Sequence, residues 1–260
     1  MSTPFDRVIE SIARARYHNH RPEGHSDLIS DGFVDDLRDA CPAFRQDLQE
    51  GRVRIWRNVA SPGDRQRKVD LFIGEPGNAG EPDVTKLRLA IENKSVITAH
   101  RNRTNRFDDL QKVMKALHGA RPEALVIATV LVGVSRRVLN VPDKLLMFFR
   151  ENRMPEFEER VLPRLSSGDE SLFSEFSWAI SKNSHNDAAS TVELMGTLPL
   201  REPAHTHIEA FDSVLLVPVE VDNVHPPRVA RANDLGLDVD FVYRECIRRT
   251  CNAYTARWHM

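Results

Sequence analysis

One stretch of the sequence is almost wholly apolar and β-branched, and it constrains the fold most strongly. Residues 123–133 read Glu-Ala-Leu-Val-Ile-Ala-Thr-Val-Leu-Val-Gly. A run of this kind is typical of a central strand that is covered on both faces, as in a parallel or mixed sheet. The chain has 260 residues, of which 41% are hydrophobic, so it can bury a substantial core. We therefore expect an α/β fold with helices on both faces of the sheet.

Upstream of this run, two shorter segments predict a hairpin. Residues 68–73 (Lys-Val-Asp-Leu-Phe-Ile) and 87–91 (Leu-Arg-Leu-Ala-Ile) have the composition of strands. The segment between them, residues 74–86, contains three glycines and two prolines, which favour a long loop. An antiparallel register centred on Glu81 follows from this arrangement.

The predicted register brings two acids together. Asp70, near the start of the first strand, lies opposite Glu92, which follows the second strand. Side chains alternate between the faces of a strand, so Glu92 and Lys94 share one face while Asn93 points away. Two carboxylates and an ammonium group are therefore expected on one surface.

This cluster suits metal-assisted hydrolysis of a phosphodiester. Mg²⁺ prefers oxygen ligands and needs only one or two protein carboxylates in addition to water and phosphate oxygens. Such an ion polarises the phosphoryl group and lowers the pKa of a bound water, and a lysine can offset the charge that develops on the phosphate. A second aspartate, Asp83, directly follows a proline, but it lies nine residues before Glu92. That is about 30 Å along an extended strand, so Asp70 is the preferred partner.

Residues Asp70 and Glu92-Asn93-Lys94 resemble the active-site motif of the PD-(D/E)xK nuclease superfamily, which includes many type II restriction endonucleases. The resemblance covers residues 68–134 and departs from the pattern at Val69, which stands where the motif has proline. It implies that Asp70 and Glu92 bind Mg²⁺, with Mn²⁺ as an alternative, and that Lys94 is the catalytic lysine. It also implies a restriction-endonuclease-like core with the order α-β-β-α-β.

The first helix is predicted over residues 4–15, where apolar residues recur at helical spacing. Superfamily members often contribute a glutamate from this helix to the metal site, which adds Glu10 as a candidate ligand; the alternative is an exposed helix acid. Residues 31–48 predict a second helical region that is broken near Pro42. Residues 51–57 predict a further strand, with Trp56 among its outward-facing residues.

A basic segment follows Lys94 and contains His100, Arg101, Arg103 and Arg106. Such side chains can contact the phosphates that flank a cleaved bond. The alternative is a solvated loop in which Arg106 pairs with an acid of its own helix. That helix is predicted over residues 107–117, with Thr104 or Asn105 as the N-cap.

The remaining segments indicate little chemistry. The pairs His18/His20 and His205/His207 lack the further ligands that a closed zinc site requires. The polar stretch that contains His18-Asn-His20 and His25-Ser-Asp27 is interpreted as a loop or as DNA-contact residues. Phe173, Phe176 and Trp178 are interpreted as core. Residues 181–190 predict an exposed loop, 212–222 a late strand, and 238–258 a final helix.

We expect a single nuclease-like domain over residues 1–260, with a catalytic core at about 50–135, an N-terminal helical region at 1–50 and C-terminal strand and helix additions at 140–260. The three cysteines are too few for a disulfide framework, and no apolar stretch predicts a membrane span, which together favour a cytoplasmic location. The net charge of -2 counts modestly against nucleic acid as a partner, although local basic patches can still bind it.

The sequence therefore predicts a Mg²⁺-dependent endonuclease acting on DNA. The resemblance alone suggests a restriction or defence role, and a homodimer remains open. The alternatives are a ribonuclease on the same scaffold and a non-catalytic nucleic-acid-binding or assembly subunit.

Overall fold

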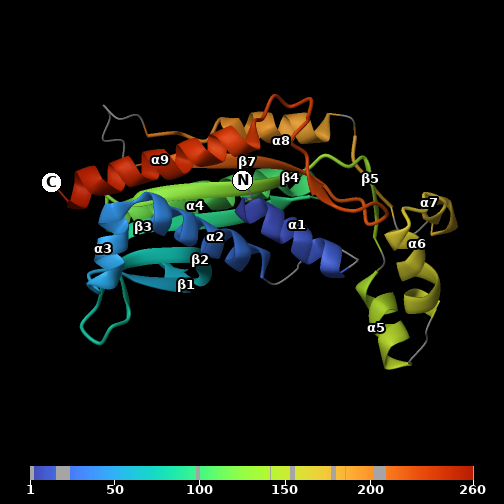
Figure 1. Cartoon of the computed structure of the whole chain (residues 1–260), viewed down its shortest axis with the longest axis horizontal. Coiled ribbons are helices and arrows are strands. Elements are labelled where there is room, and N and C mark those ends of the chain that lie inside the picture. Colours follow the sequence, from blue (N-terminus) through green and yellow to red (C-terminus); the bar gives the residue numbers. More distant parts are fainter. Residues whose placement is uncertain are drawn as a thin grey trace.

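A computed structural model of the chain describes residues 3–15, 24–97, 100–140, 142–152, 156–176, 180–184, 186–201 and 209–259. At its centre is a six-stranded mixed sheet with the order β1-β2-β3-β4-β7-β8 (Figure 1). The strands β1, β2 and β3 are antiparallel, β4 and β7 run parallel to β3, and β8 is antiparallel to β7. Their bounds are Arg54–Ser61, Asp64–Pro76, Pro82–Val96, Leu125–Gly133, Ser213–Glu220 and Arg228–Val229.

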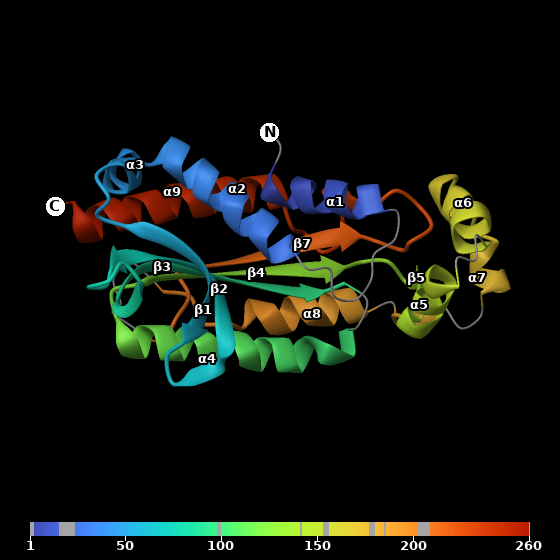
Figure 2. The same cartoon turned by 90° about the horizontal axis from the view of Figure 1, so that it is seen from below.

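Helices cover both faces of this sheet, which confirms the α/β class (Figure 2). One face carries α1, α2, α3 and α9, and the other carries α4 and α8. Their bounds are Pro4–Ala15, His25–Ala40, Pro42–Gln49 and Val239–Trp258 for the first layer, and Arg103–Ala120 and Asp187–Gly196 for the second. Each layer encloses its own cluster of buried apolar side chains.

Strand β4 is the central strand that the sequence predicted. All nine of its residues are buried. Ile127 and Leu131 pack into the core beneath α2 and α9, while Val126 and Val130 pack into the core beneath α4. The unbroken apolar run follows from this two-sided cover.

The predicted hairpin is present as β2 and β3, but both strands are longer than expected. They extend to Pro76 and from Pro82, so the loop between them is shorter. The register shifts at Gly74, where the backbones approach closely. A Cβ atom there would lie 2.6 Å from the Lys86 carbonyl oxygen, so this irregularity requires glycine.

Several element boundaries differ from the predictions. Trp56 was expected to face outward, but its ring packs edge-on against Phe72 with 5.7 Å between centroids, because α4 covers that face of β1 as well. Helix α2 begins at His25, well before the expected start, and the predicted break at Pro42 separates it from α3. Helix α4 begins directly after Asn102, following the short 3-10 turn η1, His100–Asn102.

Beyond the end of the sheet lies a small lobe of short elements (Figure 1). It consists of α5, the π-helical turn η2, α6 and α7, and a two-stranded ribbon of β5 and β6 connects it to the sheet. Their bounds are Asp143–Glu151, Glu156–Val161, Leu162–Ser166, Leu172–Glu175, Arg137–Leu139 and Ile180–Lys182. Phe173 is buried in the lobe and Phe176 packs against it, as expected for core residues, while Trp178 lies outside the described residues.

The C-terminal elements complete the main sheet. The expected loop at 181–190 is wrong, because β6 and the start of α8 occupy part of it. The final helix agrees with the prediction: Asp238 caps α9 by accepting a hydrogen bond of 2.9 Å from the Phe241 amide. No helix in the described part of the chain is long and apolar enough to cross a membrane.

Candidate functional site

The candidate site lies where strands β2 and β3 separate. The register pairs Leu71 with Ile91, and one residue further Asp70 reaches the neighbourhood of Glu92. There the Asp70 side chain, rather than its backbone, bonds the backbone of β3. Its Oδ2 atom accepts a hydrogen bond of 2.7 Å from the Asn93 amide. The predicted convergence of these two segments is confirmed.

Glu92 is the most buried acid of this cluster, with 1% of its surface exposed. Its Oε1 atom pairs with the Lys94 ammonium group. Its Oε2 atom is buried and has no hydrogen-bond partner among the described residues. Burial raises the pKa of Glu92 to about 7; the Lys94 side chain and a hydrogen bond from the Asp70 backbone amide oppose this increase, and the charge of the Asp70 carboxylate adds to it. The carboxylate is therefore poorly compensated in its charged form.

The pKa of Asp70 is also raised above its usual value. Burial raises its pKa, against the lowering effects of the Asn93 amide, Lys94 and a hydrogen bond from the Ser26 side chain. The negative charge of Asp27 raises it further. Asp70 itself is half-buried. Two adjacent carboxylates, one buried and one half-buried, whose ionised forms are both disfavoured would be stabilised by a nearby cation.

The alternation of side chains along β3 is as predicted. Lys94 lies with Glu92, whereas the Asn93 side chain reaches the opposite face and contacts α2. Its Nδ2 atom lies 3.2 Å from the Ser26 hydroxyl and 3.1 Å from the Ser30 hydroxyl. Its Oδ1 atom accepts a hydrogen bond of 2.5 Å from Thr129 on β4.

The first turn of α2 is the part of the site that the sequence analysis missed. Ser26 and Asp27 were interpreted as members of a polar loop, yet both lie in the helix next to Asp70. Ile29, Phe33 and Leu37 follow one another at intervals of four residues, which is helical spacing. That spacing was the available signal for an earlier helix start.

The residues present fit a hydrated divalent cation better than a fully protein-coordinated one. Among the described residues, no group of three or more His, Cys, Asp and Glu side chains is arranged to hold a metal ion. Asp70 and Glu92 provide two carboxylates, and the unpartnered Glu92 Oε2 atom is a free ligand position. Mg²⁺ is bound in this way when water and phosphate oxygens complete its coordination.

Glu10 does not lie with these carboxylates. It is on the exposed side of α1, where it pairs with Arg14 across 3.7 Å and keeps 64% of its side chain exposed. The apolar stripe of α1 faces the core instead. The structure therefore supports the alternative, an exposed helix acid, over the metal ligand that the resemblance suggested.

His100 was expected to contact phosphate, and this expectation is wrong for the structure. Only 2% of its surface is exposed. Its Nδ1 atom lies 2.8 Å from the Thr191 hydroxyl, and its Nε2 atom lies 2.9 Å from the Gly133 carbonyl oxygen. Burial lowers its pKa, which favours the neutral ring. At Gly133 a Cβ atom would lie 1.9 Å from the Ile97 carbonyl oxygen, so the chain after β3 packs directly on the end of β4.

The arginines of the same segment are paired with acids. Arg103 lies 3.4 Å from Asp187, and Arg106 lies 3.6 Å from Asp109 on its own helix. The pairing of Arg106 is the alternative that the sequence left open. Asp109 also binds Arg67 of β2 at 3.0 Å. The side chain of Arg101 and the residues His18, His20, His205 and His207 lie outside what the structure describes.

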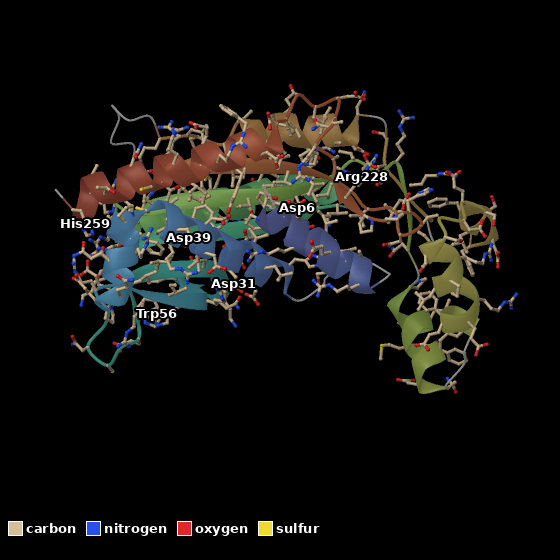
Figure 3. The ribbon with its side chains drawn as sticks, in the orientation of Figure 1. Asp6, Asp31, Asp39, Trp56, Arg228 and His259 are labelled. Atoms are coloured by element: carbon tan, nitrogen blue, oxygen red, sulfur yellow. The ribbon has the colours of Figure 1, made fainter. Side chains whose placement is uncertain are left out.

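The surroundings of the site are held by further ion pairs. Arg57 of β1 pairs with Asp31 of α2, which is labelled with Trp56 in Figure 3. A cavity of about 560 Å³ lies between α2 and α9, but none of Asp70, Glu92 and Lys94 lines it. We place the chemistry at the carboxylates rather than in this cavity, because Glu92 has a buried side-chain oxygen without a hydrogen-bond partner and no described residue that lines the cavity has such an atom.

Comparison with known proteins gives no match: no family model, curated protein or solved structure is recognisably similar to this chain.

Proposed function

We propose that this protein is a Mg²⁺-dependent endonuclease of the restriction-endonuclease-like, PD-(D/E)xK class, with DNA as its substrate and Mn²⁺ as a substitute ion. The order of elements supports this proposal. An antiparallel β1-β2-β3 unit is followed by the crossover helix α4 and by β4, which is parallel to β3. The candidate site lies on the β2-β3 pair, as the resemblance implies.

One observation carries the proposal. The buried Glu92 carboxylate has Lys94 on one oxygen and no partner among the described residues on the other, and it lies beside the half-buried carboxylate of Asp70. Buried charges are normally paired or bound to metal, because an uncompensated one is strongly destabilising. Acids with perturbed pKa values cluster at functional sites, which supports the proposal.

Each residue has a distinct role in this proposal. Asp70 and Glu92 would hold the cation. When bound, Mg²⁺ supplies Lewis-acid activation of the phosphoryl group and a more acidic water. Lys94 places a positive charge beside the reacting phosphate, where it orients the attacking water and offsets the developing negative charge. The Asn93 amide keeps the Asp70 carboxylate in line with β3.

The test is cleavage of plasmid, linear and single-stranded DNA and of RNA with Mg²⁺, with Mn²⁺, and with chelator. We expect metal-dependent cleavage of DNA that Asp70→Asn, Glu92→Gln and Lys94→Ala each reduce by at least about 100-fold. Asp83→Asn is the matched control: Asp83 is an acid of the same hairpin whose pKa is lowered by Thr85 and which lies at its exposed end.

The alternatives predict other outcomes. Cleavage of RNA alone would identify a ribonuclease on the same scaffold. Retained binding of nucleic acid with no cleavage under any condition would indicate a non-catalytic subunit. Equal losses from Asp83→Asn and Asp70→Asn would refute the assignment of the site.

A further inference from the structure

We infer that the cavity between α2 and α9 is one half of a dimer interface, which a second copy of this chain covers across a two-fold axis that runs along the cavity. We call this cavity the α2–α9 groove and define it by Asp36 and Asp39 on α2 and by Tyr243, Arg244, Ile247 and Arg248 on α9. None of the charged residues of the candidate site lines the groove, so a dimer here would form whether or not the proposed function holds.

The groove is large and mostly apolar along its floor. Its volume is about 560 Å³, which is a size at which proteins bind ligands or partner side chains. Tyr243, Ile247 and Ala40 contribute to the floor. The Tyr243 hydroxyl already donates to Asp36 at 2.6 Å, so this residue presents its ring rather than a free polar group. Covering such a surface removes apolar area from water, which favours association.

The two sides of the groove carry opposite charge. Helices α2 and α9 lie side by side on the outside of the sheet (Figure 2). The α2 side contributes Asp36 and Asp39, the second of which is labelled in Figure 3. The α9 side contributes Arg244 and Arg248. The groove therefore has an acidic side and a basic side.

One charge on each side has no partner within the described residues. Asp39 and Arg244 are both exposed, and neither side chain makes a hydrogen bond or an ion pair with another described residue. Other charges of the groove are already balanced. Arg248 pairs at 2.6 Å with an acid of its own helix, and Asp240 pairs at 2.9 Å with an arginine of the preceding loop. The uncommitted pair can thus bind charges of a partner without breaking an existing contact.

A groove with one acidic and one basic side is complementary to itself. A two-fold axis along the groove places the acidic side of each copy against the basic side of the other. An axis across the groove would instead bring like charges together. Most soluble oligomers of one chain are symmetric, and in a two-fold dimer the same patch of both copies meets itself. A second copy therefore supplies the matching charges in the matching order, and charge complementarity of this kind fixes the register of an interface.

Phe241 adds an exposed aromatic side chain at one end of the groove. It keeps 54% of its surface exposed. It lies three residues before Arg244 on α9, so the two side chains share one side of the helix. Aromatic residues are enriched in the cores of protein interfaces and contribute a large part of the binding energy there. A second copy seated on this face would cover Phe241.

The experiment measures the oligomeric state of the full chain by sedimentation velocity over a range of protein and salt concentrations. We expect a dimer that salt weakens, because salt screens exposed charges. Asp39→Lys and Arg244→Glu each place like charges opposite one another, so each should weaken dimerisation by at least about 10-fold. Phe241→Ser should weaken it by at least about fivefold. Phe148→Ser is the matched control: Phe148 is 49% exposed but lies on α5, and its loss should change dimerisation by less than about twofold.

Mixing the two charge variants tests the symmetry itself. Asp39→Lys puts a positive charge opposite the basic side, and Arg244→Glu puts a negative charge opposite the acidic side. The two variants complement each other, so an equimolar mixture should form heterodimers at a concentration at which each alone is monomeric. Thermal unfolding of each variant confirms that it is folded, as expected for exposed positions without partners among the described residues.

Three results would each overturn the inference. The first is a wild-type chain that stays monomeric at about 100 µM, which would leave the groove to a different partner. The second is a dimer that both charge variants retain at full strength, which would place the interface elsewhere. The third is a mixture of the two variants that stays monomeric, which would exclude an axis along the groove.

Discussion

The buried Glu92 carboxylate should make the metal-free protein less stable as pH rises. In the unfolded chain this group has its ordinary pKa of 4.5, whereas in the folded protein burial raises the pKa to about 7. Below pH 4.5 both states carry the proton and the group has no effect. Between these two pKa values the unfolded chain loses the proton first, so the free energy of unfolding falls as pH rises. Above about pH 7 both states are ionised and the loss is complete.

The magnitude follows from the separation of the two pKa values. Each pH unit between them corresponds to about 1.4 kcal/mol, so Glu92 should lower the free energy of unfolding by about 3 kcal/mol between about pH 4.5 and pH 8. A loss of this size is roughly a third of the 5–15 kcal/mol stability that is typical of folded proteins. Glu92→Gln keeps the size of the side chain and removes the charge, so it should remove this contribution.

The assay is denaturant unfolding of wild type and Glu92→Gln at pH 5, 6, 7 and 8 in chelator. The difference in unfolding free energy between the two proteins should change by about 2.5 kcal/mol between pH 5 and pH 8, in favour of the variant at high pH. Asp70 is present in both proteins, so its own raised pKa largely cancels. Saturating Mg²⁺ should stabilise wild type at pH 8 far more than at pH 5, because binding to the folded state adds to its stability. Parallel pH profiles for the two proteins would refute the reasoning.

Three further outcomes are expected. Arg88→Met should lower the free energy of unfolding by about 2 kcal/mol in thermal or denaturant melts, because it removes a charged hydrogen bond of 2.6 Å to the fully buried Asp47 while Arg52, Tyr254 and His259 remain as partners of that carboxylate. His100→Ala should lower the free energy of unfolding by about 2 kcal/mol by removing two buried hydrogen bonds, while the salt dependence of DNA binding, measured by fluorescence anisotropy, stays unchanged. Asp109→Asn removes the acid that pairs with two arginines, so the slope of log affinity against log salt should steepen by about one for each further phosphate that a released arginine neutralises.

The geometry of the hairpin could be predicted because it depends on local rules. Glycine and proline marked the loop, and the antiparallel register then placed Asp70 near Glu92. The alternation of side chains between the two faces of a strand correctly predicted that Asn93 points to the opposite face. The apolar run of β4 correctly indicated that this strand lies at the centre of the sheet.

The errors concern residues whose environment depends on distant partners. His100 lies in a polar segment, but its partner Thr191 is 91 residues away and no local pattern reveals it. Glu10 lies beside the apolar stripe of α1, and helical spacing alone does not say whether such a position faces a site or solvent. Ser26 lies in a polar stretch shortly after Gly24, so it was assigned to a loop rather than to the first turn of α2.

The charges of the site also explain how a chain with a net charge of -2 could act on a polyanion. Asp70 and Glu92 would repel phosphate, and Lys94 is already engaged with one of the two carboxylates. The nearby arginines are balanced by acids, among them the Arg57–Asp31 and Arg103–Asp187 pairs. Without a cation, therefore, the site offers phosphate little net attraction. A divalent ion reverses this local balance, because it neutralises both carboxylates and leaves Lys94 as surplus positive charge. Binding of substrate and activation of the scissile phosphate would then depend on the same ion.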